Sequence, residues 1–370
     1  MSTWRRITHF GFKENETIET WISNANQQNS YEVNVRYGKP IDICSLNLPV
    51  LEDLESQISE YRISREMFFG REKERILNCP ICNTDVIDCE FKLNIYGAEY
   101  YHCKICDHYF IMEKPVKSVL EDFYKHSDTS SNTYVDKRTL ETRLNQVAIP
   151  KLDWVIKQFT LQYKREPESI LDVGAGGGHF VYASKKYGLD AQGIELSKSS
   201  IKFCQENFNV NLKCADFLTE KNQYKNFDIV TFWGVLEHIP YPNDFLKAAY
   251  EILKGRKTMI VASVPRWDCF DTAVQKSFPN SIIRHLDPMG HIHCFSDSSL
   301  ANAFEINRFA PCSAWYFGMD MYELMIQLAY HLKENQIIEL FKPRLLTLQN
   351  AIDQGCLSDE MVLAGIPKKV

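Results

Sequence analysis

Two pairs of cysteines carry the clearest metal-binding pattern in the sequence. They occur as Cys79-Pro-Ile-Cys82 and Cys103-Lys-Ile-Cys106, separated by 20 residues in which positions 88–101 have the alternation of a short hairpin. Each Cys-x-x-Cys turn can aim two thiolates at one centre, and a hairpin brings two such turns together. The sequence therefore predicts a structural zinc ion with four thiolate ligands and no open coordination position.

A second motif combines an acid with closely spaced glycines after an apolar run. The motif is Asp172-Val-Gly174-Ala175-Gly176-Gly-Gly178, and its glycines let bare backbone approach a ligand. A dinucleotide-binding loop has the spacing Gly-x-Gly-x-x-Gly, whereas here the third glycine stands one place early and position 179 is a histidine. This spacing argues against a dinucleotide site.

With the acid leading, the loop resembles that of class I S-adenosylmethionine-dependent methyltransferases. The resemblance covers residues 161–317 and the last strand, and it includes two later stretches, Asp228–Pro240 and Leu253-Lys254. It implies that the chain binds S-adenosylmethionine as a methyl donor. The loop residues implied in donor binding are Asp172, Gly174, Ala175, Gly176 and Gly178.

The same resemblance implies donor contacts at the ends of the following strands. Glu195 stands 17 residues after Gly178, where a carboxylate can accept both ribose hydroxyls. Asp216 can accept the adenine amino group, while Phe217 offers apolar surface beside the ring. Trp233 is expected near the sulfonium, because an aromatic face tolerates a cation.

The acceptor side carries a weaker pattern of acid and histidine residues. Glu237 and His238 follow the fourth strand, where a group that removes the acceptor's proton is needed, and His238 is the better base by its ordinary pKa. A purely structural role for this pair explains the pattern equally well. His291 and His293 point the same way on an extended segment, so one of them could face the substrate. Metal binding by the segment that carries these histidines has little support.

The elements that must position these residues are strands alternating with helices. From residue 169 onward this alternation is typical of a parallel sheet that is covered on both faces. We expect an α/β domain at 161–370 with a doubly wound, mostly parallel, seven-stranded sheet. A substrate loop is expected at 266–293 and a helical insertion at 319–356. Because such sheets bind ligands outside the carboxyl ends of their strands, the acids should gather at one edge.

The first 160 residues divide into three parts by pattern. Residues 1–70 have helical spacing in places and are predicted to form a helical N-terminal extension. Residues 71–115 form the zinc ribbon. Residues 116–160 read as a helical lid or linker, from which Tyr134 and Arg143 could reach toward the ligand.

Charge and hydropathy limit the partners of the chain. It has 370 residues, with 42 Lys and Arg against 48 Asp and Glu, so a strongly electrostatic role on nucleic acid or a membrane surface lacks support. No apolar run approaches the roughly 20 residues of a membrane span, and no signal-peptide pattern is present. Twelve cysteines, most of them scattered, fit a reducing compartment. We expect a cytoplasmic protein.

These features together predict an enzyme that methylates a small polar acceptor, such as a nucleotide sugar or secondary metabolite, most commonly on oxygen. One alternative is an RNA methyltransferase that grips nucleic acid with the ribbon; six basic against eight acidic residues at 71–115 argue against it. Another is a non-catalytic binding protein, against which the complete set of Asp172, Glu195 and Asp216 argues. The oligomeric state is not indicated.

Overall fold

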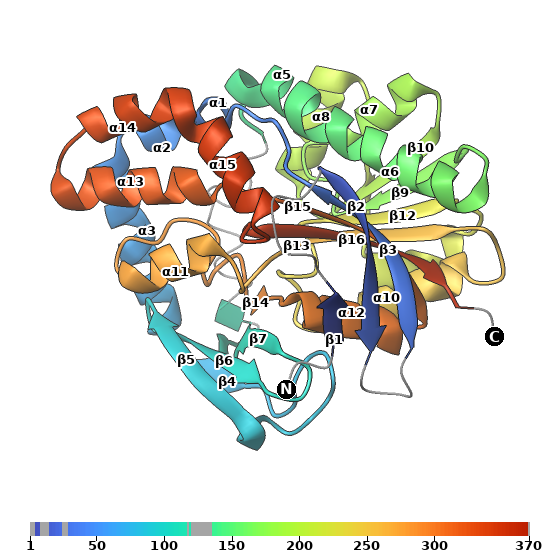
Figure 1. Ribbon diagram of the computed structural model, residues 1–370, viewed down its shortest axis with the longest axis horizontal. Helices are drawn as coiled ribbons and strands as arrows, with labels where there is room; N and C mark the ends of the chain where they lie inside the picture. The colour runs from blue at the N-terminus through green and yellow to red at the C-terminus, as the bar shows by residue number, and fades with distance from the viewer. Residues whose placement is uncertain (1–3, 8–14, 24–28, 117, 120–134, 369–370) are drawn as a thin grey trace.

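The computed structural model describes residues 4–7, 15–23, 29–116, 118–119 and 135–368 (Figure 1). Its centre is a sheet in the order β1-β2-β3-β15-β16-β13-β12-β9-β10-β11. Seven of these strands form the doubly wound part. They are β9 (Ser169–Val173), β10 (Asp190–Glu195), β11 (Lys213–Cys214), β12 (Ile229–Trp233), β13 (Met259–Pro265), β15 (Phe309–Phe317) and β16 (Glu360–Pro367).

The doubly wound part is mostly parallel, as the sequence predicts. Strands β9 to β13 pair in parallel, and only β16 runs antiparallel to its neighbours β13 and β15. All seven residues of β13 are buried, which is typical of a strand covered on both faces. From β9 the chain adds β10 and β11 on one side and then crosses back to add β12 on the other side of β9. The strand order reverses between β9 and β12, and the carboxyl ends of these two strands border the crevice where such sheets bind ligands.

The sheet has ten strands in the described residues, not seven, because the N-terminal segment adds three. These are β1 (Trp4–Ile7), β2 (Glu16–Ser23) and β3 (Ser30–Tyr37), and β3 pairs in parallel with β15. The predicted helical extension over residues 1–70 is therefore wrong for its first half. Its second half is helical, with α1 (Ile43–Leu46), α2 (Leu48–Glu52) and α3 (Leu54–Phe69).

The alternation of β2 is hidden in the sequence because two of its inward-facing residues are polar. Glu19, Trp21 and Ser23 are the buried positions of this strand. The carboxylate of Glu19 is satisfied inside the protein: it accepts hydrogen bonds from Trp21 Nε1 at 3.2 Å and from the Tyr37 hydroxyl at 2.5 Å. A pattern search that counts apolar residues alone misses such a strand.

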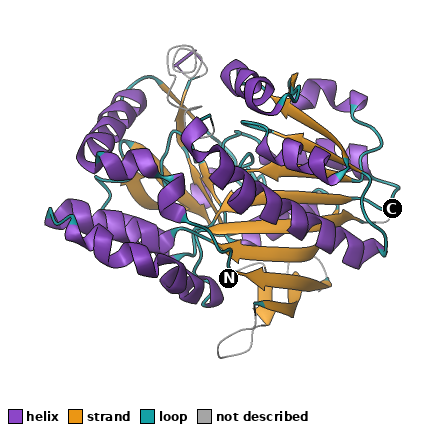
Figure 2. Ribbon diagram, turned by 90° about the horizontal axis from the view of Figure 1, so that it is seen from above, coloured by secondary structure: helices purple, strands orange, loops and turns teal. Residues whose placement is uncertain are grey.

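Helices cover both faces of the sheet: Figure 1 shows helices above and below the strands, and Figure 2 looks onto the sheet from above. Successive strand residues point to opposite faces, so Ile170 packs in one core and Leu171 in the other. On the face of Ile170 lie α6 (Ile149–Tyr163), α7 (His179–Tyr187) and α8 (Lys198–Phe208). On the face of Leu171 lie α9 (Phe217–Glu220), α10 (Pro242–Leu253) and α12 (Asp297–Ile306). The short helix α5 (Leu140–Arg143) leads through a π-helical turn, Leu144–Ala148, into α6.

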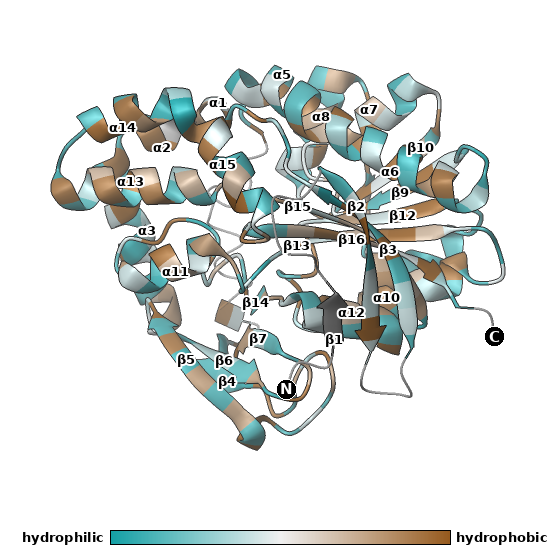
Figure 3. Ribbon diagram, in the orientation of Figure 1, coloured by the Kyte–Doolittle hydropathy of each residue, from teal (hydrophilic) through white to brown (hydrophobic). Residues whose placement is uncertain are grey.

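A separate group of helices lies beyond the carboxyl edge of the sheet. The predicted substrate loop contains α11 (Phe270–Ser277), and the segment before the last strand forms α13 (Asp320–Leu332), α14 (Gln336–Phe341) and α15 (Leu345–Gln354). Hydrophobic residues of α13 (Figure 3) pack with α1 and α3 in an apolar cluster of their own. This cluster joins the N-terminal segment to the C-terminal insertion. None of the helices in the described part of the chain has the length and apolar character needed to cross a bilayer.

The cysteine-rich segment forms a small module of antiparallel strands. They are β4 (Lys73–Arg75), β5 (Cys89–Ile95), β6 (Ala98–Cys103), β7 (His108–Ile111) and β8 (Glu113–Pro115). Strands β5 and β6 form the predicted hairpin, whose turn residues Tyr96 and Gly97 both have positive φ. Strand β14 (His293–Cys294), from the end of the substrate loop, pairs with β7. The module therefore shares a sheet with the loop that borders the crevice.

Candidate functional site

The glycine loop connects β9 to α7 at the carboxyl edge of the sheet. Gly174, Gly176 and Gly178 all have positive φ. A Cβ on Gly178 would lie 2.1 Å from the Sγ of Cys204, so a side chain cannot be accommodated there without rearrangement. The amides of Gly174 and Ala175 both donate to the carbonyl of Ile194, at 2.9 and 3.0 Å. The loop is thus held against the end of β10.

Asp172 lies below this loop and links two strands. Its side chain is buried, and its Oδ1 accepts a hydrogen bond of 2.7 Å from the hydroxyl of Thr231, the residue opposite it on β12. Burial raises the pKa of Asp172 to about 7. The carboxyl group therefore holds the two strands that border the crevice, directly under the glycine loop.

Glu195 ends β10 and connects the glycine loop to the next helix. Its Oε2 accepts the amide of Gly176 at 2.7 Å, and its Oε1 accepts the amides of Leu196 and Ser197 at 2.7 and 2.8 Å. A carboxylate has about four lone-pair sites, so three backbone bonds leave capacity for a ligand hydroxyl. The structure thus places Glu195 beside the loop and gives it a structural role that spacing alone did not indicate.

Asp216 and Phe217 follow β11, and the structure separates their surroundings. Asp216 is exposed and caps α9, since its Oδ1 accepts the amides of Leu218 at 2.8 Å and Thr219 at 3.2 Å. The ring of Phe217 is buried in the core, where its centroid lies 5.7 Å from that of Phe232. The predicted apolar surface of Phe217 beside an adenine ring is therefore not available in this arrangement.

Trp233 is the last residue of β12, and a cationic side chain of the protein already lies over its ring. The Nζ of Lys151, on α6, lies 4.5 Å from the ring centroid, and Phe180 packs edge-on against the same ring at 5.3 Å. Lys151 also lies 3.8 Å from Oε1 of Glu360, the first residue of β16. Sequence reasoning missed both Lys151 and Glu360, because nothing local in the sequence relates them to Trp233.

Glu237, His238 and His291 form a compact cluster after β12. Their potential ligand atoms lie within 4.8 Å of one another. Glu237 is 4% exposed, and burial raises its pKa to about 7. The ring of His238 is 40% exposed, and its Nε2 lies 3.8 Å from Oε1 of Glu237. The sequence predicted Glu237 and His238 as a pair and His291 separately, and the structure brings the three together.

Three further residues were predicted on the acceptor side, and only His293 and Arg143 among them are described. His293 is fully buried, with Nδ1 3.1 Å from Nε2 of His108 and Nε2 2.9 Å from the carbonyl of Ile239, so both ring nitrogens have protein partners and the residue does not face a substrate. Arg143 donates to the hydroxyl of Thr139 at 3.0 Å. Tyr134 lies outside the described residues.

The four predicted zinc ligands converge on one point. The Sγ atoms of Cys79 and Cys106 are 3.5 Å apart, and those of Cys82 and Cys103 are 3.6 Å apart. All four lie within 4.8 Å of one another. A tetrahedral zinc site with Zn–S bonds of about 2.3 Å has S–S separations of about 3.8 Å. The donor set and its spacing therefore fit a structural zinc ion.

Lys39 is a further residue that sequence reasoning missed. It follows β3 and is buried, and its Nζ lies 3.9 Å from the ring centroid of Phe317 at the end of β15. Burial lowers the pKa of Lys39 to about 7. Because β3 and β15 are parallel, Lys39 belongs to the same edge of the sheet as the glycine loop.

Comparison with known proteins identifies the central part of the chain. A family model described as "Methyltransferase domain" matches residues 150–310, somewhat less than half of the sequence. The ubiquinone biosynthesis O-methyltransferase of Coxiella burnetii is 27% identical over 151 residues, which are 40% of this chain and 62% of that protein. The protein of the same name from Thiobacillus denitrificans is 30% identical over 117 residues, 30% of this chain and 49% of that protein. The chain thus spans less than two thirds of the length of these relatives.

Solved methyltransferase structures are also similar. The plantazolicin methyltransferase BamL, in complex with a desmethyl analogue and SAH, is 14% identical with a TM-score of 0.42, covering 67% of this chain and 93% of that one. Magnesium protoporphyrin IX methyltransferase from Synechocystis PCC 6803, with bound SAH, is 10% identical with a TM-score of 0.45, covering 68% of this chain and 100% of that one. The family match and the motif at residues 172–178 agree on the same part of the chain, and we conclude that residues 150–310 carry a methyltransferase domain.

Proposed function

We propose that this chain transfers the methyl group of S-adenosylmethionine to an oxygen of a small polar acceptor, such as a nucleotide sugar or a secondary metabolite. One observation carries the proposal: the glycine loop, Glu195 and Asp216 follow three neighbouring strands at one edge of the sheet. The hydrogen bond from the Gly176 amide to Glu195 joins two parts of this edge directly. The named relatives, which are O-methyltransferases, support oxygen as the acceptor atom.

The residues at this edge fit the donor. In our proposal the backbone at Gly174–Gly178 faces the amino-acid part of the donor, because a loop without side chains allows the closest approach. Glu195 has lone-pair capacity left for the ribose hydroxyls, and Asp216 is exposed at the end of the crevice. Asp172 acts through the loop, since its carboxyl group is buried below the glycines.

The chemistry needs alignment and removal of one proton. When bound, S-adenosylmethionine supplies a methyl carbon on a positively charged sulfur. The acceptor oxygen forms a bond to this carbon while the sulfur–carbon bond breaks, and S-adenosylhomocysteine leaves. The hydroxyl proton of the acceptor must pass to another group or to water. We propose that Glu237 and His238, which follow β12, face the acceptor and assist this loss.

We further propose that Cys79, Cys82, Cys103 and Cys106 hold a structural zinc ion. The ribbon that it would stabilise contacts the substrate loop rather than extending away from the domain. The Tyr96 hydroxyl donates to the carbonyl of Ile282 at 2.9 Å, and the Tyr100 hydroxyl donates to the carbonyl of His291 at 2.8 Å. A ribbon that supports the acceptor side in this way favours a small-molecule acceptor over the RNA alternative.

Donor binding tests the proposal most directly. Glu195→Gln removes the charge while keeping the shape of the side chain, and we expect at least a tenfold loss of affinity for S-adenosylhomocysteine by calorimetry, on the order of 1.5–3 kcal/mol for charged hydrogen bonds. Glu206→Gln, on the exposed surface of α8, is the matched control and should bind normally. Unchanged affinity in Glu195→Gln would contradict the ribose assignment.

A second experiment identifies the class of acceptor. Cell extract is incubated with labelled donor and separated by size, and we expect the label in small molecules. Label in RNA would contradict a small-molecule acceptor.

A further inference from the structure

Glu237, His238 and His291 share the geometry of a three-residue metal centre at the acceptor side of the crevice. We propose that these residues bind one divalent transition-metal cation, with Mn2+ as a suitable probe. Glu237 and His238 follow the end of β12. His291 belongs to the substrate loop, 53 positions after His238 in the chain. The cation would therefore link the loop to the central sheet. The proposed role of this cation in methyl transfer rests on the proposed function, but the site itself rests on geometry.

The distances match those of ligands around one cation. All three side chains offer an atom within 4.8 Å of the others, and the distance from His238 Nε2 to Glu237 Oε1 is 3.8 Å. Nitrogen and oxygen ligands lie about 2.0–2.2 Å from such a cation, so two ligand atoms are separated by about 3–4 Å.

Both histidines are oriented for coordination through Nε2. The Nδ1 of His238 lies 2.5 Å from the carbonyl oxygen of Gly290, and the Nδ1 of His291 contacts the carbonyl oxygen of His285. A carbonyl only accepts hydrogen bonds, so each Nδ1 carries the proton and each Nε2 has a free lone pair. Metal-binding histidines are held in this way, with the second ring nitrogen donating to a backbone carbonyl or a carboxylate.

The carboxylate of Glu237 supplies an independent indication of a ligand. The residue is 4% exposed, and its Oε2 is buried with no hydrogen-bond partner among the described residues. Buried carboxylate oxygens are normally paired, because removing them from water without a partner is unfavourable. A cation bound by the two histidines would provide that partner.

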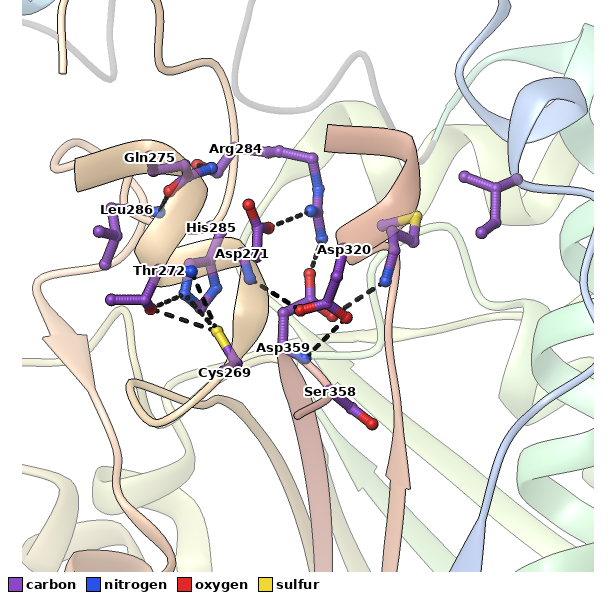
Figure 4. A network of polar contacts seen from close by, with 12 residues as sticks. Cys269, Asp271, Thr272, Gln275, Arg284, His285, Leu286, Asp320, Ser358 and Asp359 are labelled. Atoms are coloured by element: carbon purple, nitrogen blue, oxygen red, sulfur yellow. Dashed lines mark hydrogen bonds and ion pairs between the residues drawn. The ribbon is translucent and has the colours of Figure 1, made fainter. Parts of the chain in front are cut away.

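A second cluster of acids and histidine in the described residues already has a cationic partner from the protein, and the cluster at Glu237 differs from it in this respect. Asp271, His285 and Asp359 also lie within 4.8 Å of one another. There, however, Arg284 donates to Asp271 at 2.7 Å and to Asp359 at 2.5 Å, as Figure 4 shows. The guanidinium supplies the positive charge that a metal ion would bring. No Lys or Arg makes a hydrogen bond or ion pair with Glu237 in the described part of the chain.

The donor set defines the chemistry of the cation. Two imidazoles and one carboxylate form the facial arrangement that suits Fe2+, Mn2+, Co2+ or Zn2+, and this arrangement leaves coordination positions open. An acceptor hydroxyl bound at an open position would lose its proton to water more readily, because the cation stabilises the negative oxygen. The oxygen would then form its bond to the methyl carbon as the sulfur–carbon bond breaks. Glu237 and His238 would thus act on the acceptor through the cation.

Titration of the protein with Mn2+ tests the site. Binding is monitored by electron paramagnetic resonance, in which the signal of free Mn2+ is lost when the ion binds. The four-cysteine ribbon is kept loaded with zinc, and we expect one Mn2+ bound per chain. His291→Ala and Glu237→Gln should each lower the affinity at least about tenfold. Glu206→Gln, at an exposed position of α8, is the matched control for Glu237→Gln and should bind Mn2+ like the wild type.

Two results would overturn the site: no stoichiometric Mn2+ binding by the wild type, or unchanged affinity in His291→Ala. Retained affinity for S-adenosylhomocysteine shows that each variant is folded. Donor-product binding without Mn2+ binding would reject the cation site and leave the proposed function standing. Mn2+ binding without binding of S-adenosylhomocysteine would reject the proposed function and leave the cation site standing.

Discussion

The Nε2 of His108, in the cysteine-rich module, lies 3.1 Å from the Nδ1 of His293, at the end of the substrate loop. Both residues are fully buried, and the second nitrogen of His293 lies 2.9 Å from the carbonyl of Ile239, which follows β12. Two histidines thus connect the module, the loop and the central sheet. Changes in the module should therefore be felt at the acceptor side.

Loss of this contact should destabilise the protein. His108→Ala leaves the Nδ1 of His293 buried without its partner, and we expect the free energy of unfolding in urea to fall by about 1–3 kcal/mol. Lys202→Ala, at a side chain of α8 that is 75% exposed, is the control and should change it by less than about 0.5 kcal/mol. Equal stability of the two variants would show that the contact contributes little.

Removal of one cysteine should release zinc without abolishing donor binding. Cys79→Ser breaks the four-thiolate set, so we expect loss of bound zinc by elemental analysis and greater exposure of the substrate loop to protease. The donor site should remain, because the glycine loop makes its hydrogen bonds within the sheet domain.

Cys89→Ser provides the matched control for the zinc site. Cys89 lies in the same module but outside the cluster of four, so this variant should keep one zinc ion per chain. Loss of zinc from Cys89→Ser, or full retention in Cys79→Ser, would contradict the assignment of ligands.

Asp172 should make the stability of the ligand-free protein depend on pH. Its pKa is raised from 3.8 to about 7, so the unfolded chain releases this proton at a lower pH than the folded protein does. The folded state therefore loses stability as pH rises from about 4 to about 7, and Asp172→Asn avoids this loss. Relative to the wild type, Asp172→Asn should gain on the order of 2 kcal/mol between about pH 5 and about pH 8. Urea unfolding at both values checks this, and a difference that does not change with pH would show that the carboxyl group is not perturbed.

The packing of the glycine loop can be separated from its backbone conformation. Gly178 and Gly188 both have positive φ, but an added Cβ would meet Cys204 Sγ at 2.1 Å in the first case and nothing within 4 Å in the second. Gly188→Ala should cost only the conformational penalty, about 1 kcal/mol. Gly178→Ala should lower the free energy of unfolding by roughly 1–3 kcal/mol more than Gly188→Ala does, because its added methyl group overpacks the contact with Cys204. Equal thermal stability of the two variants would show that α8 adjusts freely to the loop.

Local patterns predicted the doubly wound strands and helices well, because each has a period that can be counted within a few residues. The hairpin within residues 88–101 and the alternation of strands and helices from residue 169 onward are examples. The N-terminal strands were missed because β2 buries Glu19, whose partner Tyr37 is on another strand. No single-segment pattern contains that information.

The sequence by itself determined the glycine loop, the four convergent cysteines and the parallel sheet that presents the acids at one edge. It determined them because apolar periodicity, glycine spacing and paired cysteines act over short stretches of chain. Only the tertiary structure decided that Lys151 covers Trp233, that Phe217 is part of the core, and that His291 meets Glu237 and His238. These contacts join residues tens of positions apart, so they depend on the path that the folded chain takes between them.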